Sequence, residues 1–94
     1  MNEIYKVRWS SRFKKDYKRA MRRGEDIAKL DETIQQLANG ESLPATMHDH
    51  ELAGKWIRHR ECHLAPDWLL IYTIQNDVLV LELTRTGSHA DLFE

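Results

Sequence analysis

Hydrophobic and polar residues alternate at the start of the chain and then follow a helical period. In segment 4–9 apolar side chains alternate with basic ones, which predicts a half-buried strand. Ser10 and the serine after it are typical of a helix start. The apolar positions then recur at helical spacing among basic residues; they are Phe13, Tyr17, Ala20 and Met21. Gly24 is typical of a helix end, so the pattern predicts a basic amphipathic helix up to this glycine.

A second helix is predicted over 26–38, where an apolar stripe ends at an Asn-Gly pair. Residues 41–54 show no period and contain a proline, so they are predicted to form a loop. Branched and aromatic residues then predict three strands, with a short turn at 75–77 between the last two. These strands are expected at 55–62, 67–74 and 78–84, the last with Leu79, Leu81 and Leu83 on one face. Residues 88–94 are expected to form a tail.

The order of elements is one strand, two helices and three strands. It predicts an α+β fold in which a two-helix hairpin packs on a mainly antiparallel sheet. A chain of 94 residues is of single-domain size, so we expect one domain over 1–94.

The composition excludes several classes of protein. Hydrophobic residues make up 41% and charged residues 31%, which is typical of a globular domain. The longest apolar run, 68–72, is too short for a transmembrane helix, and the first residues do not resemble a signal peptide. Cys62 is the single cysteine and cannot form an internal disulfide. We therefore expect no membrane partner, a cytoplasmic location and an inert thiol.

Charge is divided unevenly along the chain. Up to residue 30 there are ten Lys and Arg against four Asp and Glu, a balance of +6. From residue 31 there are four against eleven, a balance of −7, which gives the net charge of −1. The basic third predicts a polyanionic or acidic partner, although a solvated helix face explains it equally well. If RNA is the partner, we expect the first helix to dock it with Lys14, Lys15 and Lys18.

All five histidines lie in the second half, at positions 48, 50, 59, 63 and 89. One interpretation is a metal site from His48, His50, His63 and Asp67, but this spacing matches no specific zinc pattern. The other is acid–base cleavage of RNA without a metal ion. There a base takes the ribose 2′-OH proton, an acid protonates the leaving 5′-oxygen, and Arg85 stabilises the phosphate charge. An aromatic ring beside them can stack on an unpaired base.

Three ordered segments carry a resemblance to a known family. Segment 60–72 (RECHLAPDWLLIY) resembles the signature of YafQ-type toxins of the RelE superfamily, and 85–93 (RTGSHADLF) is similar to their closing motif. Leu43-Pro44 and the loop at 49–54 also match, as does the start at 11–16, so the resemblance spans nearly the whole chain.

The resemblance implies a RelE-like fold and a type II toxin, an endoribonuclease that cuts mRNA on the ribosome without a cofactor. It also implies a cognate antitoxin of the DinJ or RelB kind. Carried over by position, the catalytic residues are His50, His63, Asp67, Arg85 and His89, and the substrate-binding aromatics are Trp68 and Phe93. The residues alone leave other roles open for these side chains. Trp68 and Phe93 can belong to the core, and His63 with Asp67 can stabilise a turn.

Two other functions remain open at this point. A ParE-like toxin of the same fold would block a protein target such as DNA gyrase, although such relatives generally lack the histidines. A non-catalytic RNA-binding module would use only the basic helix. Cleavage of ribosome-bound transcripts by the purified chain separates the first interpretation from both.

Overall fold

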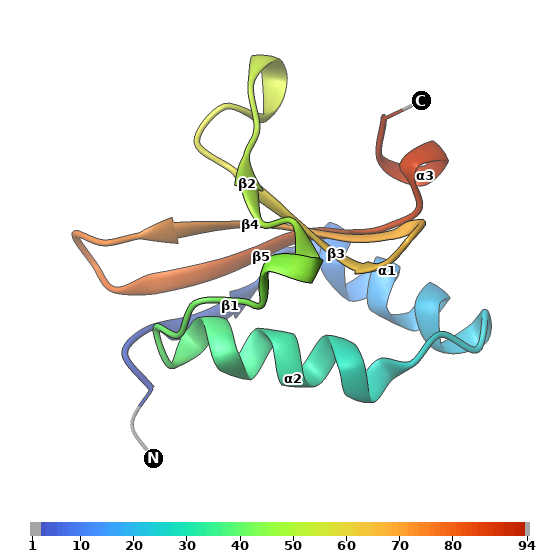
Figure 1. Cartoon of the computed structure of the whole chain (residues 1–94), viewed down its shortest axis with the longest axis horizontal. Coiled ribbons are helices and arrows are strands. Elements are labelled where there is room, and N and C mark those ends of the chain that lie inside the picture. The colour runs from blue at the N-terminus through green and yellow to red at the C-terminus, as the bar shows by residue number, and fades with distance from the viewer. Residues whose placement is uncertain (1–2, 94) are drawn as a thin grey trace.

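The computed structural model describes residues 3–93 and contains a five-stranded sheet. The strands are β1 (Lys6–Trp9), β2 (His50–Glu51), β3 (Arg60–Ala65), β4 (Trp68–Gln75) and β5 (Val80–Gly87). Their order across the sheet is β1-β5-β4-β3-β2, in which β1 pairs parallel with β5 and the other neighbours are antiparallel. The helices α1 (Ser11–Arg22) and α2 (Ile27–Ala38) cover one face of the sheet (Figure 1). This confirms the predicted α+β fold.

Both long helices begin and end where the sequence predicts. The side chain of Ser10 accepts a hydrogen bond from the backbone N–H of Phe13, and Asp26 caps α2 in the same way. Gly24 follows α1 with φ 77°, a left-handed conformation that glycine adopts without strain. The N–H of Gly24 bonds to the carbonyl of Met21, and the next N–H bonds to Ala20, which completes a Schellman end.

The principal core lies between the helices and the sheet. Phe13 and Leu30 from the helices meet Leu70, Leu81 and Leu83 from the strands, and all five side chains are fully buried. Burial of this apolar surface supplies the main driving force for folding. None of the helices in residues 3–93 has the length and apolar character needed to span a membrane.

Several predicted boundaries are wrong. The strand expected over 55–62 begins at Arg60, because Gly54–Trp56 forms a short 3₁₀ turn and Arg58 has φ 72°. The loop expected over 41–54 contains a 3₁₀ turn (Ala45–Met47) and the short strand β2. Short 3₁₀ turns, a two-residue strand and a positive φ at Arg58 do not give the sequence a regular hydrophobic period, so the pattern could not predict them.

The end of the chain also differs from expectation. Leu79 lies in the β4–β5 turn with φ 53° and is half-exposed, so it does not share the buried face of Leu81. The predicted tail forms helix α3 (His89–Phe93), while residue 94 lies outside the described residues. Ser88 and Asp91 start this helix by a reciprocal capping interaction. The Asp91 N–H donates to the Ser88 hydroxyl, and the Ser88 N–H donates to the Asp91 carboxylate.

Candidate active site

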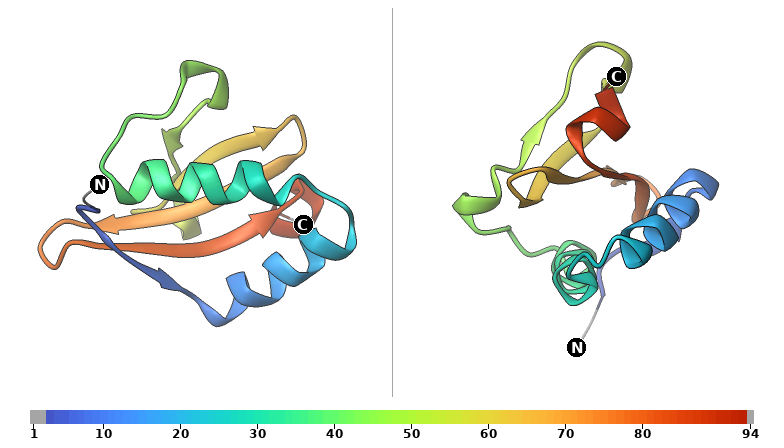
Figure 2. Two further views of the ribbon diagram at one scale, coloured as in Figure 1. Left: turned by 90° about the horizontal axis from the view of Figure 1, so that it is seen from below. Right: turned by 90° about the vertical axis from the view of Figure 1, so that its right-hand side faces the viewer.

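Four of the five histidines gather on the face of the sheet that α1 and α2 do not cover. Helix α3 lies on this side, opposite α1 and α2, and so does the segment around β2 (Figure 2). His63 projects from β3 to this face, because its neighbours Cys62 and Leu64 belong to the core under the helices. Beneath it, Leu69, Ile71 and Leu92 form a small apolar cluster that attaches α3 to the sheet.

His63 is the centre of the cluster. Its ring centre lies 5.6 Å from that of His48, 6.4 Å from that of His50 and 6.0 Å from that of His89. The four rings come from β3, from β2 and the residues just before it, and from the start of α3, so the tertiary fold brings them together. The predicted site residues His50, His63 and His89 therefore share one surface.

The ring of His50 is oriented by a local backbone bond. Its Nδ1 lies 2.6 Å from the carbonyl oxygen of His48. A carbonyl can only accept a hydrogen bond, so Nδ1 carries the proton and Nε2 is the nitrogen that can exchange a proton with a substrate. His48 itself has φ 49°, a left-handed backbone that is uncommon for a residue with a side chain.

The ring of His89 is oriented by the carboxylate of Asp67. Nδ1 of His89 lies 2.7 Å from Oδ1 of Asp67, and the backbone N–H of His89 donates to the same oxygen at 2.9 Å. The backbone bond and then the side-chain bond from His89 hold the pKa of Asp67 below its ordinary value. Asp67 thus stays a carboxylate acceptor, and Nε2 of His89 remains available to a substrate.

Glu61 is a site residue that sequence reasoning missed. It precedes His63 by two positions on β3, so both side chains project to the same face. One of its carboxylate oxygens lies 3.4 Å from Nε2 of His50 and 3.4 Å from Nε2 of His63, and Glu61 is only 6% exposed. A buried carboxylate at a strand position that faces histidines is typical of a functional site. The period-two spacing of Glu61 and His63 was the available signal.

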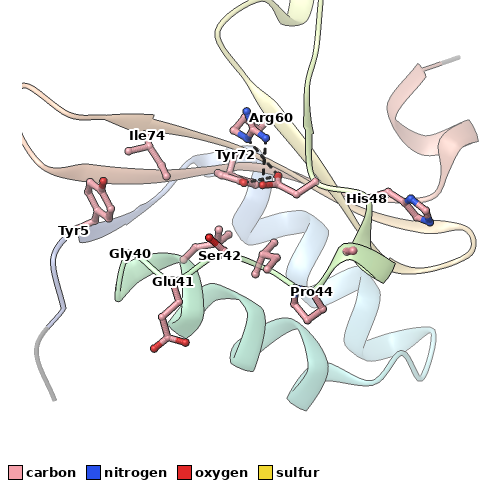
Figure 3. A pocket seen from close by; sticks show the side chains of 13 residues that line it. Tyr5, Gly40, Glu41, Ser42, Pro44, His48, Arg60, Tyr72 and Ile74 are labelled. Atoms are coloured by element: carbon pink, nitrogen blue, oxygen red, sulfur yellow. Dashed lines mark hydrogen bonds and ion pairs between the residues drawn. The ribbon is translucent and has the colours of Figure 1, made fainter.

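Asp49 fastens the histidine-bearing segment to the sheet. Its carboxylate accepts hydrogen bonds from the Tyr72 hydroxyl at 2.5 Å and from Arg60 at 3.3 and 3.4 Å. Burial and the neighbouring Asp49 raise the pKa of Tyr72, so its hydroxyl stays protonated and donates. These groups line a pocket between the sheet and the end of α2, with His48 at its rim (Figure 3). Asp49 therefore fixes the backbone on which His48 and His50 lie.

The two predicted aromatic residues have different environments. Phe93 is 42% exposed, and its ring centre lies 6.3 Å from that of His89 and 6.5 Å from that of Trp56. Trp68 is 3% exposed and packs in the core under the helices. The stacking role predicted for Trp68 does not fit this burial, because a buried ring offers no face to a base.

Arg85 is held in a buried ion pair with Asp16. Its Nε donates to Asp16 at 2.6 Å and its Nη2 donates to the same carboxylate at 3.2 Å. Arg85 is 8% exposed and Asp16 is 5% exposed, and Asp16 also accepts from the N–H of Thr86. The side chain predicted to stabilise a phosphate therefore also joins α1 to β5.

The basic residues of α1 and its C-cap, Arg23, divide into two groups. Arg19 and Arg23 form ion pairs with Asp91 of α3 at 3.5 and 2.7 Å, and Arg19 also contacts Asp16. The Asp91 pKa is lowered, first by the Arg23 hydrogen bond. Within residues 3–93, the other cations of the helix take part in no ion pair and are exposed; they are Arg12, Lys14, Lys15, Lys18 and Arg22.

The described part of the chain contains neither a reactive thiol nor a group of side chains arranged to bind a metal ion. Burial raises the pKa of Cys62 to about 12, so the thiol is protonated at neutral pH and unreactive. Residues 3–93 present no group of three or more His, Cys, Asp or Glu side chains arranged to hold a metal ion.

Comparison with known proteins gives a consistent result. The model of the YafQ family, bacterial toxins of type II toxin–antitoxin systems, matches residues 5–94. The chain is 41% identical over 88 residues to the mRNA interferase toxin YafQ of Escherichia coli K12, which covers 93% of this chain and 94% of the relative.

Two solved structures extend the comparison. The E. coli DinJ–YafQ toxin–antitoxin complex contains a chain that is 38% identical with a TM-score of 0.88, covering 97% of this chain and 99% of that one. A metal-bound toxin from Helicobacter pylori is 38% identical with a TM-score of 0.89, covering 95% of this chain and 99% of the other.

Proposed function

The chain belongs to the YafQ family of bacterial toxins of type II toxin–antitoxin systems, and we propose that it cuts ribosome-bound mRNA by acid–base catalysis without a metal ion. Like the E. coli relative named for this activity, it is an mRNA interferase, which is an endoribonuclease. The observation that carries the mechanism is the convergence of three imidazoles on His63 over the open face of the sheet.

The orientation of the rings supports two proton transfers. Nδ1 of His50 and Nδ1 of His89 are both engaged by acceptors, which leaves Nε2 of each ring to exchange a proton. One Nε2 removes the 2′-OH proton while the other, protonated, donates to the leaving 5′-oxygen. The 2′-oxygen then forms a new bond to phosphorus as the 5′-oxygen leaves, which yields a 2′,3′-cyclic phosphate and a 5′-hydroxyl. His63, held by Glu61, lies between the two rings and stabilises charge on the phosphate.

Other residues position the RNA. Phe93 follows His89 on α3 and is exposed, so it is the aromatic ring that can stack on a base next to the cleaved bond. Lys14, Lys15 and Lys18 are exposed on α1 and are proposed to dock phosphates of ribosomal RNA. Trp68 supports the fold on the helix-covered side of the sheet, and Asp16 holds Arg85 in place.

An antitoxin completes the proposed system. The solved E. coli complex pairs YafQ with DinJ, and we propose that an antitoxin of this kind binds and silences this chain. The basic first third of the sequence favours an acidic or amphipathic segment as the inhibitory part. The toxin acts where ribosomes translate, in the cytoplasm.

The experiment that tests the proposed function is sequencing of RNA 5′-ends after brief induction in cells. The wild-type chain should create new 5′-ends within translated messages, whereas His63→Ala should create none. Growth arrest without new 5′-ends would contradict the proposal and favour a protein target. Co-expression of the antitoxin should remove both the arrest and the cleavage.

A further inference from the structure

A second cavity lies between the start of α1, the 3₁₀ turn Gly54–Trp56, the second half of β5 and α3. It has a volume of about 370 Å³ and is lined by Ser10, Arg12, Lys55, Trp56, Thr84, Arg85, Asp91 and Leu92. The strand β1 pairs with β5 only as far as Leu83, and beyond it the side chains of Ser10 and Asp16 take over, bonding to the Thr84 carbonyl and the Thr86 N–H. The cavity opens at this edge, outside the histidine cluster.

Positive groups from three parts of the fold meet at this cavity. Arg12 on α1 and Lys55 in the 3₁₀ turn are exposed, and neither takes part in an ion pair within residues 3–93. Arg85 is nine-tenths buried, and both Nε and Nη2 donate to Asp16. In the described part of the chain Nη1 of Arg85 has no hydrogen-bond partner, so this nitrogen remains for a ligand in the cavity.

The start of α1 adds to the same field. Ser10 caps the helix and Arg12 is its second residue, so the positive end of the helix lies at the cavity. The first turn of α1 contains no acidic residue that would neutralise it. The Asp91 carboxylate in the cavity wall is already bound by Arg23 and contacted by Arg19. The balance of charge in the cavity is therefore positive.

Two buried polar atoms in the wall are unsatisfied. Nε1 of Trp56 and Oγ1 of Thr84 have no hydrogen-bond partner within residues 3–93. Such groups are rare in folded proteins and commonly mark a place where a water molecule or ligand binds. They strengthen the case that the cavity holds a polar ligand.

Two aromatic rings link the cavity to the proposed active site. Trp56 lines the cavity and contacts Phe93 at 6.5 Å between ring centres, and Phe93 in turn lies 6.3 Å from His89. These two aromatic rings stand between the histidines and the cavity. An RNA strand that crosses the histidines and passes over Phe93 would bring a neighbouring backbone phosphate to the cavity.

We propose that this cavity is a subsite for an RNA phosphate that flanks the cleaved phosphodiester, bound by Arg12, Lys55 and Nη1 of Arg85. The inference rests on the proposed function and extends it, because the ligand belongs to the same substrate. Phosphate contacts position a nucleic acid without reading its bases. The subsite therefore sets which phosphodiester reaches the histidines, and it does not select the base sequence.

The test uses ribosomes programmed with short synthetic mRNAs. In each mRNA one phosphate beside the cleavage site is replaced by an uncharged methylphosphonate. For the wild-type chain, kcat/KM should fall about tenfold at one flanking position, which is the scale of one charged contact. The Arg12→Gln/Lys55→Gln double variant should be about tenfold slower on native mRNA and insensitive to that same replacement. Both residues are exposed, so the variant should fold as stably as the wild type.

The matched control removes one lysine and one arginine elsewhere. Lys6→Gln/Arg8→Gln on the exposed side of β1 should keep the full sensitivity to the methylphosphonate. A double variant at the cavity that is as sensitive as the wild type would overturn the subsite while leaving the proposed function intact. Normal cleavage by that variant with weakened antitoxin binding would also overturn it and would assign the cavity to an acidic antitoxin side chain. Absence of cleavage by the wild-type chain would refute the proposed function and the subsite with it.

Discussion

The two faces of the sheet bury very different amounts of apolar surface. Among residues 3–93, the cluster under α1 and α2 joins fourteen buried residues, whereas the cluster on the opposite face joins three, Leu69, Ile71 and Leu92. Strand β4 serves both, since Leu70 and Tyr72 face the helices while Leu69 and Ile71 face away. Because most of the stability comes from one face, the other can hold polar, exposed histidines at little cost to the fold.

Arg85 contributes to stability through Asp16, although it lies opposite Ile71 on the histidine-bearing side of the sheet. Arg85→Ala would remove the closest cation from the buried Asp16 carboxylate and leave it with Arg19 and the Thr86 N–H. Breaking a buried pair of this kind costs about 3–5 kcal/mol. The free energy of unfolding, measured with urea, should fall by that amount. Arg8→Ala, which breaks an exposed pair with Glu82, is the control and should change it by less than about 1 kcal/mol. Lost cleavage with wild-type stability would instead place Arg85 with the catalytic groups.

Substitutions of the histidines should reduce catalysis without reducing the stability of the fold. His89→Ala removes a general acid or base and His63→Ala removes a group that stabilises phosphate charge, and each should lower the cleavage rate of ribosome-bound mRNA by about 10²-fold or more. Urea unfolding and antitoxin binding should remain close to wild type, because these rings contribute little to the core. His59→Ala is the matched control, since His59 contacts Trp56 and lies outside the cluster around His63. Equal losses from all three substitutions would refute the assignment.

Much of the helix-covered face could be predicted from the sequence. The spacing of Phe13 and Leu30 indicates helical stripes, and Gly24 marks a helix end by its freedom to adopt positive φ. The strand β2 could not be predicted, because a ladder of two residue pairs carries no period. The left-handed Arg58 and Leu79 likewise shifted the predicted strand ends, since neither is a residue type that signals a turn.

The open face was harder to predict. The resemblance located His50, His63, Asp67 and His89 on one surface, yet it gave no sign of the burial of Glu61. Sequence also does not tell which aromatic residue is exposed: Trp68 and Phe93 are both apolar, but tertiary packing buries only Trp68. Arg85 finds its partner Asp16 on α1, far away in the chain, and such a pairing depends on the tertiary fold.

A smaller effect is expected on the outer side of α1. Lys14, Lys15 and Lys18 are exposed, and their replacement by Glu should weaken ribosome binding about tenfold at physiological salt. Cosedimentation with ribosomes over a range of salt concentrations measures this change, and wild-type binding should weaken steeply as salt rises. Stability should not change, because exposed charges contribute little to it. Cosedimentation of the triple variant equal to that of the wild type would show that α1 does not dock RNA.

The smallest expected effect is a change in the free energy of unfolding at acidic pH. The pKa of Asp67 is below its ordinary value of 3.8, mainly because of the bonds from His89. A lowered folded pKa means that this stabilisation is present above the ordinary value and is lost as the pH falls through the folded value. The difference in free energy of unfolding between the wild type and Asp67→Asn should therefore shrink between pH 6 and about pH 3. A difference that stays constant over this range would show that the His89 bonds do not favour the charged carboxylate.

The most direct test of the central claim, that the histidine face cleaves RNA by metal-free acid–base catalysis, is end-group analysis of the cleaved mRNA. Attack by the substrate's own 2′-OH predicts fragments with 2′,3′-cyclic phosphates and 5′-hydroxyls. Cleavage should continue at the same rate when zinc and manganese are withheld and only the magnesium that the ribosome needs is present. Fragments that carry 5′-phosphates, or a requirement for zinc or manganese, would contradict this mechanism, because two-metal nucleases activate water in place of the ribose hydroxyl.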